Sequence, residues 1–125
     1  MKKRFLALPA LALALACGMA QAQTFRCGGI GTAEQDQFKA EASQHDALLT
    51  FALSTGAYVS DVDVTVTDGR GKTVVQGRCG GPLMLLDLPG KGTYRVNASY
   101  EGKAQSKSLS LGAKPARAVF TWPAG

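Results

Sequence analysis

Histidine is almost absent from this sequence: among 125 residues the only one is His45. A Ser-His-Asp triad needs a histidine that is held by an acid and faces a nucleophile. A structural zinc site needs four ligands, which are mostly cysteine and histidine. His45 stands beside Asp46 at the expected end of a helix, where a protonated imidazole complements the helix dipole. The shortage of histidine argues against both kinds of site, and we expect no metal or cofactor.

Dense clusters of acidic residues are also missing. Asp61 and Asp63 share one face of an expected strand, and Asp68 follows in a turn. Paired carboxylates can serve glycoside hydrolysis or bind calcium. Calcium takes six or more oxygen ligands, and no segment here is rich enough in Asp or Asn to supply them. We therefore expect a solvated strand face and no catalytic residue, and a small hydrolase built on His45, Asp61 and Asp63 is the enzyme alternative.

Long apolar runs are missing after the first segment, since no later stretch approaches the ~20 residues that span a bilayer. That first segment, residues 1–22, has the three parts of a secretory signal peptide: a charged start, an apolar run at residues 5–16 and an Ala-x-Ala cleavage site. We expect cleavage after Ala22 and a periplasmic protein without a transmembrane segment. A lipoprotein is the alternative, because residues 14–17 loosely resemble a bacterial lipobox that would place a lipid on Cys17.

A basic track is missing once the signal peptide is removed. Residues 1–22 hold three of the 14 Lys and Arg residues and none of the nine Asp and Glu residues, so the mature chain carries +2 instead of +5. Proteins that bind nucleic acid neutralise a series of phosphates with clustered Lys and Arg. The mature chain has no such run, and we expect no nucleic-acid partner.

The mature chain has two cysteines, Cys27 and Cys79, each followed by two glycines. Cysteine pairs close into disulfides in exported proteins. A bridge between these two would enclose 51 residues, and in the chain-entropy model a loop of that size stabilises a fold by about 4 kcal/mol. We expect a structural disulfide. A redox pair is the alternative, although the Cys-x-x-Cys spacing typical of redox motifs is missing.

Local patterns predict one helix followed by seven strands. Thr32 and Gln35 resemble a capping box for a helix over residues 33–43, whose thin apolar stripe is centred on Phe38. Polar and apolar residues alternate from residue 47, most regularly at residues 61–67. The expected strands cover residues 47–53, 61–67, 73–76, 83–88, 93–100, 105–111 and 116–122, with a hairpin turn at residues 68–71. The chain divides into a signal peptide (1–22), an N-terminal segment with the helix (23–46) and a β domain (47–125).

Seven short strands, each with one apolar face, favour two sheets packed face to face. We predict an all-β fold: a seven-stranded immunoglobulin- or transthyretin-like β-sandwich preceded by one short α-helix, in a monomer. The strand at residues 105–111 is mostly polar; it contains Lys107, and Lys103 lies just before it. It suits the edge of a sheet, because lysine there opposes pairing with other chains.

Two motifs carry a resemblance to a known family. Residues 88–98 have a Leu-Pro turn, a glycine and a tyrosine followed by alternating apolar positions, with one extra residue in the turn. Residues 57–64 and the turn at 68–71 look like a strand and its hairpin. The sequence thereby resembles the carboxypeptidase regulatory-like domain, and the order of its motifs is similar to that of a set of small exported proteobacterial proteins. The resemblance implies a transthyretin-like sandwich without active-site residues, since in carboxypeptidases this domain stands beside the enzyme.

Two features are candidate interaction surfaces. The apolar run at residues 83–86 would place Leu83 and Leu85 on an outer sheet face, covered either by the helix through Phe38 or by a partner. Tyr58 and Trp122 could offer aromatic faces to a sugar or a peptide, although packing in a core is the commoner fate. We therefore predict a non-catalytic binding or accessory module that uses a surface patch or an exposed strand edge, with an envelope protein or peptide as its partner. A lipid-anchored structural envelope protein is the alternative.

Overall fold

The computed structural model describes residues 25–112 and 114–124, which form eight strands and one α-helix. The strands are β1 (Phe25–Gly28), β2 (Ala47–Leu53), β3 (Val62–Thr67), β4 (Thr73–Cys79), β5 (Leu83–Leu86), β6 (Gly92–Tyr100), β7 (Lys103–Leu111) and β8 (Ala116–Trp122). The helix α2 (Thr32–Glu41) continues into a 3-10 turn, η2 (Ala42–Gln44). Within these residues no helix has the length and apolar character needed to cross a membrane. The predicted signal peptide and the alternative lipid site Cys17 lie outside the described residues.

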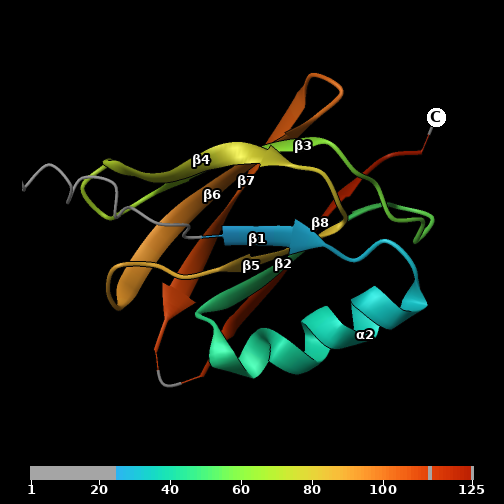
Figure 1. Cartoon of the computed structure of the whole chain (residues 1–125). Helices are drawn as coiled ribbons and strands as arrows, with labels where there is room; N and C mark the ends of the chain where they lie inside the picture. The colour runs from blue at the N-terminus through green and yellow to red at the C-terminus, as the bar shows by residue number, and fades with distance from the viewer. Residues whose placement is uncertain (1–24, 113, 125) are drawn as a thin grey trace, which may run out of the picture.

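The strands form two four-stranded sheets. Sheet A has the order β1-β5-β2-β8, and β8 runs parallel to β2. Sheet B has the order β4-β3-β6-β7 and is antiparallel throughout. Figure 1 shows the two sheets as layers, with α2 crossing the face of sheet A that points away from sheet B. The edge strands are therefore β1 and β8 in one sheet and β4 and β7 in the other.

The two sheets share one core because their facing positions are apolar. On β3, Val62 and Val64 are buried and Asp63 between them is exposed, as the alternation predicts. Sheet A contributes Phe51 and Phe120, whose rings lie 5.9 Å apart. The predicted mostly β architecture with two packed sheets and one short helix is confirmed, and the immunoglobulin- or transthyretin-like fold type stays a prediction.

Helix α2 covers part of the outer face of sheet A. A second buried cluster joins Phe38 and Ala42 from the helical segment to Leu48, Leu83 and Leu85 from the sheet. This explains why β5 is apolar on both faces, since one face meets the core and the other meets the helix. Of the two covers expected for Leu83 and Leu85, the structure shows the helix, so neither leucine belongs to an exposed interaction surface.

Strand β1 corrects the predicted number of strands from seven to eight. It lies in the N-terminal segment, where only a helix is predicted, and it pairs with β5, with Cys27 opposite Met84. Four residues that end in glycine are too few to display an alternating pattern. The strand depends on its non-local partner, and α2 consequently lies between two strands of sheet A instead of before the sandwich.

The start of α2 differs from the predicted capping box. Gly31 is the N-cap in place of Thr32, and no side chain caps the helix there. Gly31 has a φ of 91°, a conformation that a residue with a Cβ rarely adopts. Glu34 and Gln35 reach back instead: the Glu34 carboxylate accepts a hydrogen bond from the Gly29 N–H at 2.8 Å, and the Gln35 amide donates to the Gly29 carbonyl at 3.0 Å. The glycine-rich segment is thus held by two side chains of the first helical turns.

The hairpin predicted at residues 68–71 is confirmed between β3 and β4. One oxygen of the Asp68 carboxylate accepts hydrogen bonds from the N–H groups of Lys72 and Arg70, both at 2.9 Å. These bonds hold the pKa of the Asp68 carboxyl below its ordinary value of 3.8. A lowered pKa in the folded state means that Asp68 stabilises the hairpin above its ordinary pKa, and that this contribution is lost as the pH falls through the lowered value.

Candidate functional site

The disulfide between Cys27 and Cys79 closes one side of the sandwich. It joins β1 of sheet A to β4 of sheet B, with the two Cα atoms 5.4 Å apart. Next to it the backbone of Gly81 lies against Gly28, and a Cβ on Gly81 would lie 2.3 Å from the Gly28 carbonyl oxygen. The predicted pairing is confirmed, and the glycines beside it permit a close approach of two backbones.

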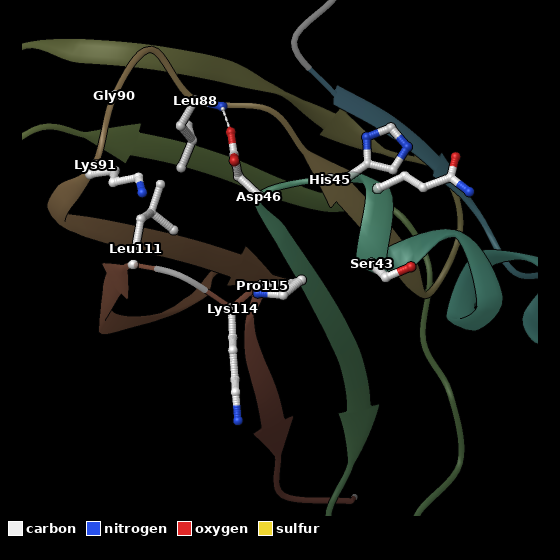
Figure 2. A pocket seen from close by; sticks show the side chains of 11 residues that line it. Ser43, His45, Asp46, Leu88, Gly90, Lys91, Leu111, Lys114 and Pro115 are labelled. Atoms are coloured by element: carbon white, nitrogen blue, oxygen red, sulfur yellow. Dashed lines mark hydrogen bonds between the residues drawn. The ribbon is translucent and has the colours of Figure 1, made fainter.

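His45 and Asp46 lie at one end of the sandwich, beside a pocket of about 400 Å³ (Figure 2). The Nδ1 atom of His45 is 3.0 Å from a carboxylate oxygen of Asp87. Figure 2 shows the Asp46 carboxylate turned toward Leu88, whose N–H donates to it at 2.8 Å. Both side chains tie the start of β2 to the segment after β5.

Asp61 and Asp63 line a different pocket, of about 540 Å³. Asp63 pairs with Arg78 at 3.0 Å, and Tyr100 shares the pocket. The pocket beside His45 includes Leu111, the last residue of β7. The pocket beside Asp61 includes Glu101 and Gly102, which precede β7. The two pockets therefore lie at opposite ends of this strand. The structure therefore does not bring His45 together with the two aspartates, as the enzyme alternative requires. Within residues 25–112 and 114–124 no three metal-ligating side chains are grouped to hold an ion.

The two aromatic candidates, Tyr58 and Trp122, differ in their exposure to solvent. Trp122 is 2% exposed, stacks among the rings of Phe51, Tyr100 and Phe120, and donates its indole N–H to the Lys103 carbonyl at 2.8 Å. Its inclusion in an interaction surface is therefore wrong, because the indole closes the core between β8 and β7. Tyr58, in contrast, is 42% exposed and remains available on the surface.

Strand β8 presents an unpaired backbone edge. The Ala116 N–H donates to the Asp46 carbonyl, and the Ser54 N–H donates to the Trp122 carbonyl, so the even-numbered residues of β8 bond to β2. Alternate residues of a strand direct their N–H and C=O groups to opposite sides. Arg117, Val119 and Thr121 therefore direct theirs away from sheet A. Of these outward groups, the Thr121 carbonyl accepts a hydrogen bond from the Gln105 side chain.

The other three sheet edges, at β1, β4 and β7, are less accessible to an added strand. Strand β1 has four residues, and its Phe25 ring packs over Gly77 of β4, where a Cβ would lie 2.7 Å from the ring. These two edges also meet at the disulfide. Strand β7 places Gln105 and Lys107 opposite Ala98 and Val96 of β6, on the face toward sheet A. Inward polar and charged side chains protect an edge from pairing, so β8 is the edge best suited to accept another strand.

An exposed part of the outer face of sheet A adjoins the free edge of β8. Val119 is 53% exposed and is paired with Thr50 of β2. In the next outward row, Thr121 is paired with Ala52, which forms a bridge to Tyr58. We call Arg117, Val119 and Thr121 the β8 edge, and these residues share one sheet face with Tyr58. Val119 is not among the residues predicted for a site; its signal in the sequence is an apolar residue out of phase with the buried residues of its strand.

Basic residues predominate on β7, on β8 and in the connection between them. After Glu101 the sequence contains Lys103, Lys107, Lys114 and Arg117, and it contains no Asp or Glu. None of the ion pairs within the described part of the chain involves these four side chains. Within the described residues, therefore, no ion pair neutralises their charge.

The sequence matches no protein-family model, and no curated protein matches it at significant similarity. The fold and the edge geometry define the class of protein: a disulfide-linked β domain of two packed sheets with an unpaired strand edge at β8. The two candidate binding features there are the outward backbone of β8 and the basic side chains near it.

Proposed function

We propose that this chain is a non-catalytic binding or accessory domain of carboxypeptidase regulatory-like type, which acts in the periplasm and holds its partner by strand addition to β8. The observation that supports it most directly is the outward backbone of Arg117, Val119 and Thr121. In strand addition an extended peptide gains main-chain hydrogen bonds from a free edge, and alternate side chains provide specificity.

The β8 edge meets the requirements of this binding mode better than the other edges. Strand β8, to which this edge belongs, has seven residues, a full strand length. Strand β2 holds it along its whole inner side, so no reorganisation of the sheet is needed before a peptide binds. Val119 offers an exposed apolar contact beside the bonding groups. A partner that pairs with β8 would place alternate side chains next to Val119, on the face that also carries Tyr58.

A substitution at Val119 tests strand addition separately from charge. The probe is an uncharged peptide of about nine residues in which valine alternates with glutamine. We expect Val119→Lys to weaken its binding at least tenfold, about 1.4 kcal/mol, because a lysine on the edge interferes with pairing. The measurement is isothermal titration calorimetry.

The matched control is Gln76→Lys, which adds the same charge at an exposed position of β4 on the disulfide-closed side. We expect this variant to bind the peptide as the wild type does. Equal loss of binding in the two variants, or no binding to the wild type, would contradict strand addition at β8.

The periplasmic location has its own test, the intact mass of the protein purified from its native envelope. We expect a chain that begins at Gln23, since an Ala-x-Ala site precedes it. We also expect Cys27 and Cys79 to resist alkylation until they are reduced, because they form a disulfide. A chain that begins at a lipid-modified Cys17 would place the domain on a membrane surface instead and would refute the soluble form of the proposal.

A further inference from the structure

We infer that the segment that adds to β8 is an acidic one, an extended stretch of a partner protein in which carboxylates alternate with apolar residues. This inference rests on the proposed strand addition and names the chemistry of the partner. Its basis is the distribution of charge around the free edge, which the backbone geometry alone does not determine.

The geometry gives the two faces of an added strand different neighbours. On the outer face its side chains would lie beside Val119, which is half exposed and apolar. On the inner face they would lie beside Phe120, and the Lys107 Nζ atom is 5.9 Å from the centre of that ring. The Gln105 side chain also reaches β8 there, at the Thr121 carbonyl. Apolar residues on one face and carboxylates on the other would match these surroundings.

The charged side chains around the edge are mostly basic, and one acidic residue, Glu101, lines a pocket with Lys103 and Trp122 at the end of β8. Lys103 and Lys107 come from β7, Lys114 from the connection and Arg117 from β8 itself. The described ion pairs satisfy none of them, so an incoming carboxylate does not have to displace an internal partner. Complementary charge of this kind accelerates association and excludes like-charged partners.

The same charge disfavours a second copy of this chain at the edge. Two β8 strands paired about a twofold axis would bring the two β7 strands near each other, and each of these carries Lys103 and Lys107. Like charges brought close together oppose association. An acidic segment of another protein has no such conflict, and we therefore assign the edge to it.

Three peptides of about nine residues test the inference, in which valine alternates with glutamate, glutamine or lysine. We expect the glutamate peptide to bind the full-length domain about tenfold more tightly than the glutamine peptide at low salt, and the lysine peptide to bind most weakly. The advantage of the glutamate peptide should shrink between about 20 mM and about 300 mM NaCl, because salt screens exposed charges.

Lys107→Gln is expected to weaken binding of the glutamate peptide about threefold and to leave the glutamine peptide unchanged. The matched control is Lys39→Gln on α2, an exposed position away from β8, which should change neither. A charge effect confined to Lys107 would support the inner-face placement of the carboxylates, and equal effects of the two variants would contradict it.

The outcomes separate the inference from the proposed function. Equal binding of the glutamate and glutamine peptides at both salt concentrations would overturn the acidic partner and leave strand addition intact. No binding of any peptide would overturn both. Dimerisation of the wild type that Val119→Lys abolishes, measured by sedimentation without peptide, would overturn the acidic partner in favour of a second copy.

Discussion

Replacing both Cys27 and Cys79 by alanine is expected to lower the free energy of unfolding by about 4 kcal/mol. The two residues are 52 positions apart in the sequence, and in the chain-entropy model a loop of that length costs an unfolded chain about this much conformational freedom when it is closed. The bond also fixes the four-residue strand β1 to the opposite sheet. Urea unfolding of the variant and of the wild type measures the difference.

Wild-type protein unfolded in the presence of reductant provides the control. Since it loses the same cross-link without a change of side chain, we expect a similar loss of stability. A loss below about 1 kcal/mol in both experiments would contradict the structural role of the bond and would return the pair to the redox alternative.

Phe38→Ala is expected to destabilise the protein by about 3–5 kcal/mol, the range for removal of a large aromatic side chain from a packed core. Phe38 is 3% exposed and is the central contact of α2 with Leu83 and Leu85. Its loss would leave a cavity between the helix and sheet A, and it would expose leucines that the helix now covers. Urea unfolding monitored by circular dichroism measures the effect.

Ile30→Ala is the matched control for Phe38→Ala. Ile30 is a large apolar residue close to the same helix, but it is 69% exposed. We expect a change within about 0.5 kcal/mol, because exposed side chains away from structural features contribute little. Equal effects of the two substitutions would mean that α2 does not depend on Phe38 for its position on sheet A.

The strands that the sequence predicts best are those with an uninterrupted local signal. Residues 116–122 form a strand as expected, and residues 62–67 do so with one residue less at the start. The hairpin at residues 68–71 follows from turn-forming residues between two alternating runs. These elements were predictable because the alternation and the turn chemistry lie within a few adjacent residues.

The elements that the sequence analysis missed depend on distant parts of the chain. Strand β1 exists through its pairing with β5 and its bond to Cys79. The helix begins after Gly31 because the side chains of Glu34 and Gln35 hydrogen-bond to Gly29 in the preceding segment. The capping-box pattern predicts a different contact, in which Gln35 pairs with an N-cap at Thr32. A short segment carries too few residues for a pattern that would reveal such partners.

The candidate site was predictable only in part for the same reason. The residues that neighbour Tyr58 and Trp122 in the sequence do not indicate which of the two aromatic side chains is exposed and which is buried. Val119 becomes an edge residue because β8 pairs in parallel with β2 at the end of sheet A, and the order of strands in a sheet is a property of the whole fold. The basic character of residues 102–125 was available in the sequence, but its significance depends on which of these residues border a free edge.

Amide hydrogen exchange on β8, measured with and without the peptide that binds most tightly of the three, tests strand addition most directly. We expect the amides of Arg117, Val119 and Thr121 to exchange rapidly in the free protein and at least tenfold more slowly in the complex, because they would donate to the added strand. The amides of Ala118 and Phe120, which face β2, should be protected in both states. Binding that slows exchange on another strand and leaves these three amides unchanged would contradict the account.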